Sequence, residues 1–450
     1  MKNQRQIILI AFSIFYLLSE FTNIIYFSIL TAICLLIIIV QNMPLVGKTN
    51  QKISLVLFFF GIMFLIKTNS SIGEWITAIS SNSGLVVLFI VLPFLSFPLY
   101  FEDYEKSLRQ FSLKHINNVI QFGNLSGFLT YFLSALLNVG SFPIVYNLFD
   151  KTVDFTDKDR TLWLSMMRGN TAAIFWSPNF VAVAVILHYL ELPWLTILPM
   201  GFLLSLITMF SNWVTMYVRA KLNEEQYERK EIPYDLTPED NKKLFKLTRT
   251  FLILILLIGF FNIFTTLKLL VIVPIVALIY PLLLAILQKS FSSYIKQLKN
   301  YYTKSLLNIK NEIIIFAAAG FFGKSLEISG VGEIIPSLIK LDSIHQPFLV
   351  ILAIIILMGA LSIIGIHPIV TSTALATTIG AETLGISVYA YAFTLLASYG
   401  LSVLISPFSG MNLVMSGLTK HSSWELGPRL NIIYCLGMGI IFAIIIPFIK

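Results

Sequence analysis

The chain contains one short segment twice, once in each half. Residues 135–145 read ALLNVGSFPIV and residues 360–370 read ALSIIGIHPIV, with six of eleven positions identical. The offset of 225 residues is half of the 450-residue chain. A Ser-Pro pair follows in each half, at residues 177–178 and 406–407, at nearly the same offset. Repetition at this scale indicates a fold built from two related halves that interrupt their helices at matching places.

The remainder of the chain is strongly apolar. Hydrophobic residues make up 57% of it and charged residues 12%, roughly half the charged share of a soluble domain. Apolar stretches of membrane-spanning length recur from end to end, which predicts an all-α polytopic membrane protein without a sizeable soluble domain. The first apolar run lacks a small-residue cleavage site, so we expect it to be a membrane helix. Cys34 and Cys435 both lie in apolar segments, so we expect neither disulfides nor metal clusters.

The apolar segments predict about eleven full crossings and two re-entrant hairpins. We place the crossings at residues 6–20, 24–41, 53–67, 84–101, 161–190, 194–219, 247–264, 268–288, 312–329, 386–417 and 430–448. The hairpins, which carry the duplicated segment, are 119–150 and 347–380, and each is followed by a broken helix, 161–190 or 386–417. Residues 1–23 form an extra helix, 24–219 the first repeat, 220–246 a cytoplasmic linker and 247–450 the second repeat.

The distribution of basic residues sets the orientation. With the N-terminus in the cytoplasm, 25 of the 31 Lys and Arg residues fall in cytoplasmic segments, as the positive-inside rule requires. A full crossing at 119–150 would put the basic loops 220–246 and 289–311 outside, which favours the hairpin. The C-terminus is then outside, and an odd number of crossings inverts the second repeat. The net charge of +8 reflects this orientation in the cell (cytoplasmic) membrane and does not indicate a nucleic-acid partner.

The interruptions of the helices predict the binding site. Backbone at membrane depth is hydrogen-bonded internally unless it lines an enclosed or water-filled cavity. Proline frees a carbonyl one turn earlier, and glycine permits left-handed turns. In the first half the predicted substrate and ion site comprises Gly140, Ser141, Pro143, Arg168, Asn170, Thr171, Ser177, Pro178 and Asn179. In the second half it comprises Gly365, His367, Pro368, Thr371, Ser372, Thr373, Ser406, Pro407, Ser409, Gly410 and Asn412.

These residue types suit a cation and an anion bound side by side. Freed carbonyls and hydroxyl or amide oxygens are hard ligands for Na⁺, which we expect at Ser141, Asn179, Ser406 and Ser409. Half-helix N-termini present N–H groups to an anion. We expect no organic cofactor and no resident metal centre. Two simpler explanations stay open: the prolines are only kinks, and Asn170 only bonds a neighbouring helix.

Two cationic side chains lie in the predicted site. Arg168 falls inside a span, where it binds the anion, reaches the cytoplasm, or pairs with Asp157 or Asp159. His367 replaces Phe142 at the equivalent repeat position, which suggests an anion contact, a proton-sensitive gate or a buried hydrogen-bonded histidine. The cavity segments contain no Asp or Glu at mid-membrane depth, and Glu312 only begins a span, which disfavours a carboxylate-based proton antiporter.

Eleven crossings, two oppositely opening hairpins and the broken helices after them resemble the ion transporter superfamily, and within it the divalent anion:sodium symporter family. That family carries Ser-Asn-Thr motifs at both hairpin tips. Here the first tip is Gly-Ser-Phe-Pro at 140–143, with Asn-Thr displaced to 170–171, and Thr-Ser-Thr at 371–373 follows the second tip. The resemblance implies an elevator mechanism and a homodimer, whereas the altered motifs leave dicarboxylate specificity open.

The sequence therefore predicts a secondary active transporter that moves a small organic anion of the carboxylate type, coupled to Na⁺, across the lipid bilayer. An H⁺-coupled carrier or a carrier of inorganic oxyanions from the same superfamily is an open alternative. A membrane-embedded polysaccharide polymerase or ligase is a second one, although the chain has no HExxH or GxSxG motif. A transporter with two parallel six-helix halves is disfavoured by the charge distribution.

Overall fold

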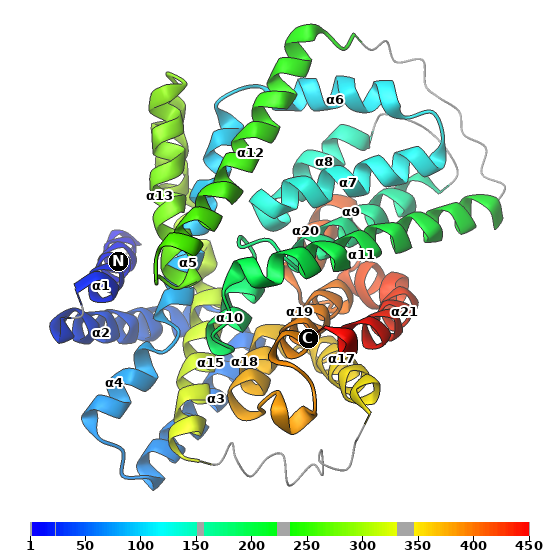
Figure 1. Cartoon of the computed structure of the whole chain (residues 1–450). Helices are drawn as coiled ribbons and strands as arrows, with labels where there is room; N and C mark the ends of the chain where they lie inside the picture. Colours follow the sequence, from blue (N-terminus) through cyan, green and yellow to red (C-terminus); the bar gives the residue numbers. More distant parts are fainter. Residues whose placement is uncertain (1, 23, 151–156, 223–234, 331–345, 450) are drawn as a thin grey trace.

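The computed structural model describes residues 2–22, 24–150, 157–222, 235–330 and 346–449, and these ranges contain helices but no strand (Figure 1). After α1 (Lys2–Thr22), the first series of helices is α2 (Ile25–Asn42), α3 (Lys48–Lys67), α4 (Ile72–Ser80), α5 (Ser83–Val91), α6 (Tyr104–His115), α7 (Val119–Leu137), α8 (Ser141–Phe149), α9 (Lys158–Ile174), α10 (Val181–Tyr189) and α11 (Trp194–Leu222). The second is α12 (Pro238–Phe264), α13 (Leu269–Leu287), α14 (Phe291–Asn300), α15 (Lys310–Ile328), α17 (Pro347–Ile363), α18 (Pro368–Thr378), α19 (Val388–Ile405), α20 (Gly410–Thr419) and α21 (Leu430–Ile445).

Both series end in the same kinds of element. A helical hairpin (α7–α8 or α17–α18) is followed by a broken helix (α9–α10 or α19–α20) and then by one more helix, α11 or α21. Eleven helices in the described ranges are long and apolar enough to cross a membrane. The protein is therefore a multi-pass helical membrane protein, and the expected number of about eleven membrane helices is confirmed.

The set of long apolar helices differs from the prediction at one pair of segments. The stretch Val119–Phe149 has the length and hydropathy of a span, although a 3₁₀ turn at Asn138–Gly140 divides it into α7 and α8. The predicted crossing 161–190 is absent from the set because its helices, α9 and α10, have only 17 and 9 residues. Each of the two segments is thus formed by a pair of shorter helices.

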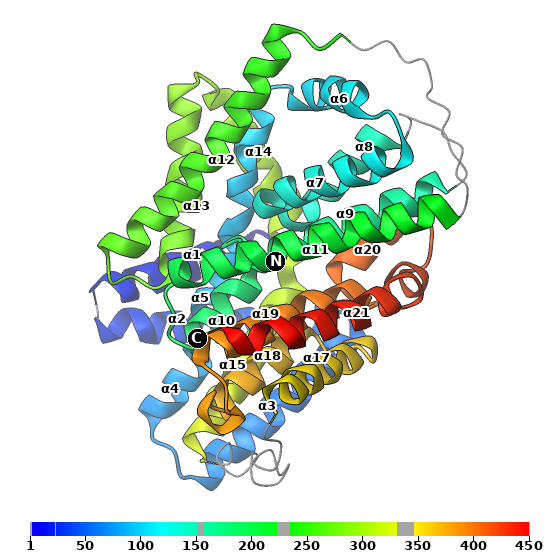
Figure 2. The same ribbon diagram turned by 45° about the vertical axis from the view of Figure 1, so that its right-hand side comes forward.

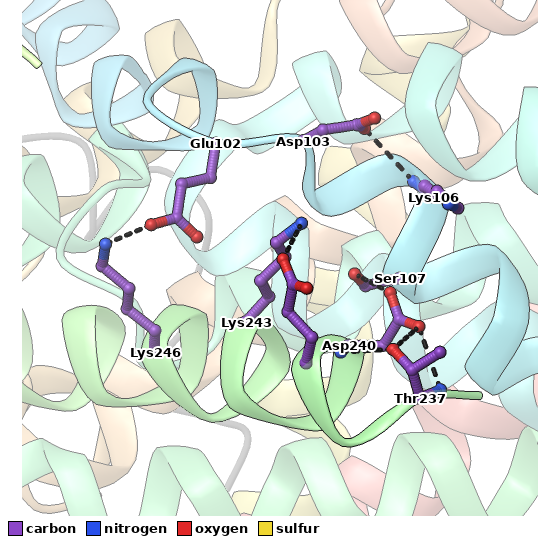
Figure 3. Close-up of polar contacts among 9 residues, drawn as sticks. Glu102, Asp103, Lys106, Ser107, Thr237, Asp240, Lys243 and Lys246 are labelled. Atoms are coloured by element: carbon purple, nitrogen blue, oxygen red, sulfur yellow. Dashed lines mark hydrogen bonds and ion pairs between the residues drawn. The ribbon is translucent and has the colours of Figure 1, made fainter.

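The linker between the two series is shorter than predicted, because α12 begins at Pro238 rather than near residue 247. Thr237 and Asp240 form a capping box at this end, which satisfies N–H groups that a helix start leaves free. The Ser107 hydroxyl of α6 donates to Asp240 at 2.7 Å, and Lys246 pairs with Glu102 (Figure 3). Burial raises the pKa of the nearby Tyr104 to about 12, so its hydroxyl stays neutral. These contacts fasten α6 to the start of α12.

Helices from both series interlock in one part of the molecule, which we call the scaffold group and define as α1–α5 and α12–α15. Here α3 packs against α15, and α13 packs against α5 and the 3₁₀ helix Leu92–Tyr100 that follows it. The Asn82 amide donates to the Phe316 carbonyl at 2.9 Å, and Gly320 leaves the space that this side chain fills. In both views α1, α2, α4 and α13 lie on the left (Figures 1 and 2).

The hairpins and broken helices form a second part, the hairpin group, defined as α7–α11 and α17–α21. Each hairpin's first helix packs along its broken helix, α7 on α9 and α17 on α19, and α9 also contacts α19. In both views α8, α9, α20 and α21 lie on the right (Figures 1 and 2). The two groups meet where α18 packs against α15, and also where α10 packs against α5 and α13 and where α11 packs against α12. The second hairpin therefore lies directly against the scaffold group.

Candidate functional site

The first hairpin turns at Asn138, which has a positive φ of 51°. Gly140, expected to provide the left-handed turn, has a φ of −64°. Ser141 begins α8, where its hydroxyl donates to the Asn138 carbonyl at 2.9 Å and lies 2.6 Å from the Ser134 hydroxyl. Pro143 occupies the first turn of α8, a position that tolerates proline. Hydrogen bonds of the hairpin's own serine side chains, Ser134 and Ser141, thus stabilise the turn.

The second hairpin turns at Gly365, whose φ of +102° is a conformation that few residues besides glycine adopt. His367 then caps α18, because its Nδ1 accepts a hydrogen bond from the Ile369 N–H at 3.2 Å. Pro368 is the first residue of α18, where its missing N–H costs nothing. His367 is therefore a hydrogen-bonded histidine, one of the three explanations that the sequence left open, and its bond shapes the start of α18.

Both helix breaks lie at the Ser-Pro pairs. The first runs from residue 175 to 180 and the second from 406 to 409. The residues 168–173 lie before the first break, because α9 stays helical to Ile174. Gly169 instead lets α9 approach α7, since an added Cβ would meet the Gly127 carbonyl oxygen at 2.3 Å. Pro178 and Pro407 lie inside the breaks, where each lacks a helical N–H.

A serine in each break bonds the hairpin of the same half. The Ser177 hydroxyl donates to the Ala135 carbonyl, and the Ser406 hydroxyl donates to the Ser362 carbonyl, both at 2.8 Å. Each carbonyl belongs to the last turn of the hairpin's first helix. Asn179 adds a bond from its amide to a further carbonyl of the first hairpin. The two halves thus join hairpin and broken helix by the same contact.

In each half, one asparagine has a buried side-chain oxygen that accepts no hydrogen bond from the described residues. Asn170 donates its amide to the Ser134 hydroxyl at 2.9 Å, and Asn412 donates to the Ser406 carbonyl at 2.9 Å. The Oδ1 atoms of both asparagines are buried without a hydrogen-bond partner among the described residues. Buried acceptors are usually satisfied, so these two oxygens are candidates for contact with an ion or substrate.

Arg168 lies apart from the hairpin turns. Its guanidinium bonds the amide oxygens of Asn212 and Asn431, each at 3.3 Å, and lies 3.9 Å from the centre of the Tyr434 ring. The alternative pairing with Asp157 or Asp159 is not found, since Asp157 pairs with Arg219 and Asp159 lies 3.9 Å from Lys158. At 2% exposure Arg168 does not reach the cytoplasm either. It lines a groove of about 690 Å³ between α9, α11 and α21.

The remaining predicted threonines and serines lie within helices. Thr171 bonds the Met167 carbonyl of its own helix at 3.0 Å. Thr371 bonds the Pro368 carbonyl at 2.9 Å, one turn beyond the second tip. The hydroxyls of Ser372 and Thr373 are buried and have no partner in the described part of the chain. Thr373 faces Gly323 of α15, so this run of residues lies at the interface with the scaffold group.

Several predicted residues of the second half meet at one polar pocket of about 120 Å³. Its predicted members are Gly365, His367, Pro368, Ser406, Ser409 and Gly410. The helices α18 and α20 both begin here, and Ser409 caps α20 by accepting from the Asn412 N–H at 3.2 Å. Two helix N-termini therefore border the pocket. At α18 Pro368 has no N–H, and the Ile369 and Val370 N–H groups bond His367. The positive ends of the two helix dipoles still favour a negatively charged ligand.

The scaffold group adds Ile315 and three polar residues that sequence reasoning missed, namely Asn50, Asn311 and Glu312. Asn311 accepts a hydrogen bond from the Gly47 N–H at 3.0 Å, which joins the start of α15 to the start of α3. Glu312 Oε2 is buried and lacks a hydrogen-bond partner within the described ranges. The pocket thus contains a carboxylate, contrary to expectation. In the sequence Glu312 is an ordinary acidic residue of a helix's first turn, and only tertiary packing brings it here.

The four residues expected to bind Na⁺ fall into two places. Ser406 and Ser409 line the pocket, whereas Ser141 and Asn179 contact the first hairpin. Among the described residues, no group of three or more His, Cys, Asp or Glu side chains could hold a metal ion. The pocket combines hydroxyl and amide oxygens, one carboxylate, one imidazole and two helix N-termini, a set that can contact either an anion or a hard cation.

Comparison with known proteins finds similarity to solved structures. No family model matches the chain, and no curated protein matches it. The crystal structure of the Alcanivorax borkumensis YdaH transporter, described as having an unusual topology, aligns with a TM-score of 0.47 and 12% identity. The alignment covers 88% of this chain and 97% of that one. Similarity at this level does not determine the function of this protein.

Proposed function

We propose that the protein is a secondary active transporter that moves a small carboxylate-type organic anion across the cell membrane, with Na⁺ as the coupling ion. The observation that carries the proposal is the contact repeated in both halves, in which a broken-helix serine bonds the last turn of a hairpin. Broken helices of this kind supply unpaired N–H groups for an anion and freed carbonyls for a cation. The pocket at the second half combines two helix N-termini with the hydroxyl groups of Ser406 and Ser409.

The two series of helices support an alternating-access mechanism. The duplicated segments, the similar element order and the positive-inside orientation together favour two inverted repeats with the N-terminus in the cytoplasm. In this proposal the hairpin group is the moving body and the scaffold group stays fixed, as in an elevator. The interface between α15 and α18 is then the surface along which the second hairpin moves.

The same orientation assigns a state to the structure. With the N-terminus inside, α3 and α15 both start at the cytoplasmic end of the scaffold group. Asn50 and Asn311, which line the pocket, lie in the first turns of these helices. The second half-site is therefore near the cytoplasm, and the proposal describes this conformation as inward-facing.

The size of the pocket limits what it holds in this conformation. A volume of 120 Å³ corresponds to about four water molecules. Small carboxylates such as formate or acetate, or one carboxylate group of a longer acid, fit such a space. The proposal therefore places a single carboxylate at the N-termini of α18 and α20, beside the neutral oxygens of Ser406 and Ser409.

Ligand-dependent thermal stability of the detergent-purified protein tests the proposal. Mono-, di- and tricarboxylates, sulfate and phosphate are each added in Na⁺ and in K⁺ buffers. A ligand that binds only the folded state stabilises it by about 2.7 kcal/mol at a hundredfold excess over Kd. We expect a shift for one class of carboxylate, larger in Na⁺. A shift for inorganic oxyanions alone changes the substrate class, and no shift with any anion contradicts the proposal.

A further inference from the structure

Glu312 adds a carboxyl group to the pocket, and this group takes no part in the repeated contacts between hairpins and broken helices. Its carboxylate lines the same 120 Å³ space as His367, Ser406 and Ser409, and one of its oxygens is buried without a partner among the described residues. We propose that Glu312 links anion binding in this pocket to the uptake of one proton. The inference rests on the proposed function, since it requires that an anion binds here.

Charge repulsion is the physical basis of this link. An ionised carboxylate and an anion within one small pocket repel each other, and the repulsion is strong where little water separates them. A proton on Glu312 removes the repulsion and turns the carboxyl group into a hydrogen-bond donor for the anion. The anion therefore binds best when Glu312 is protonated, and by linkage its binding draws a proton onto this side chain.

The surroundings of Glu312 contain few groups that could neutralise it. His367 is the other titratable side chain lining the pocket. On the helices packed nearby, Lys48 and Lys52 of α3 are exposed to the surroundings and Lys310 begins α15. None of the ion pairs in the described ranges involves Glu312. A change in the proton occupancy of Glu312 is thus felt directly by an anion in the pocket.

The location of Glu312 makes the effect depend on the conformation. Glu312 belongs to the scaffold group, whereas His367, Ser406 and Ser409 belong to the hairpin group. When the hairpin group moves, the anion leaves the neighbourhood of Glu312. Its carboxylate therefore acts in the inward-facing state alone, where ionisation expels the anion toward the cytoplasm and protonation retains it.

The test is the pH dependence of anion affinity in purified protein. Formate, acetate and sulfate serve as probes because they stay ionised between about pH 6 and pH 8.5. For the native protein, Kd from thermal shifts should rise with pH, by up to about tenfold per pH unit when one proton is taken up. Glu312→Gln, which mimics the protonated acid, should bind with a nearly constant Kd, close to the native value at low pH.

Three further variants separate the explanations. Glu327→Gln changes an exposed glutamate on the same helix, which pairs with Lys324, and should keep the native pH slope. Glu312→Asp keeps a titratable group and should also keep a slope, even if Glu312→Gln folds poorly. His367→Gln should leave the slope intact. An unchanged slope in Glu312→Gln, or a slope lost only in His367→Gln, overturns the inference while the transporter proposal stands. Absence of binding by every probe and carboxylate overturns both.

Discussion

Ser177 and Ser406 each close a gap between a broken helix and a hairpin, and the side chain of Ser406 also borders the pocket. Replacing Ser406 by Leu removes the donor to the Ser362 carbonyl and fills part of a small space. A buried acceptor left unpaired costs about 1–3 kcal/mol. We expect Ser406→Leu, and likewise Ser177→Leu, to lose transport and the anion-dependent thermal shift while still inserting into the membrane.

The matched control is Ser292→Leu, which places the same side chain on the exposed face of α14. Membrane yield and elution volume report insertion and folding, and the thermal shift reports binding. Normal shifts in both Ser177→Leu and Ser406→Leu would mean that the breaks do not form the binding site.

Arg168 holds three helices together in the structure, because its contacts reach Asn212 of α11 and both Asn431 and Tyr434 of α21. A desolvated cation–π contact alone contributes about 2 kcal/mol. Arg168→Gln should therefore lower the melting temperature and leave the anion-induced shift nearly unchanged. Arg168→Lys, which keeps the charge but not the planar donors, should have an intermediate effect. Native stability combined with a lost shift would assign Arg168 to the substrate instead.

At the scale of elements, the contact between α7 and α9 depends on two glycines. A Cβ at Gly169 would lie 2.3 Å from the Gly127 carbonyl oxygen, so the helices must separate to admit one. Overpacking of this kind costs about 1–3 kcal/mol. We expect Gly169→Ala to lower the melting temperature measurably. Gly417→Ala is the matched control, because a Cβ there meets nothing within 4 Å, and it should be neutral or slightly stabilising.

The first hairpin has a topology that can be tested directly. Lys114 precedes α7 and Asp159 lies in the first turn of α9, and both are exposed. If α7 and α8 enter and leave on the same side, cysteines at both positions are labelled from the cytoplasmic side by a membrane-impermeant maleimide. Labelling is compared in inside-out and right-side-out vesicles. Labelling of the two cysteines from opposite sides would show that residues 119–149 cross the membrane.

Sequence patterns located the hairpins and broken helices more accurately than the individual residues that form their turns and breaks. Gly365 and Pro368 lie at the second hairpin turn, where glycine and proline have local reasons to be. In the first broken helix, the sequence did not indicate that Gly169 allows close packing against α7, because that contact joins two separate helices. The positive φ at Asn138 was missed because asparagine is a less specific turn signal than the neighbouring Gly140.

At the scale of the whole molecule, hydropathy predicted an all-helical membrane protein with about eleven long apolar helices. It could not predict that α3 and α15 bring Asn50 and Glu312 to the second hairpin, because contacts between distant helices leave no local pattern. For the same reason Arg168 was assigned to the site, although its partners lie on α11 and α21. The sequence identified about half of the residues that line the pocket, and the other lining residues are brought there by tertiary packing.

The central claim is that an anion bound at the broken helices is carried across the membrane with a cation. The most direct measurement is the current from proteoliposomes on a solid-supported membrane after a jump in carboxylate concentration, with Na⁺ or K⁺ present and with Ser406→Leu as the inactive control. We predict a current for the carboxylates that stabilise the purified protein, larger in Na⁺ and absent in the variant. To separate electroneutral transport from its absence, uptake of the same radiolabelled carboxylate is followed in parallel. A carboxylate that binds but gives neither current nor uptake would contradict the account.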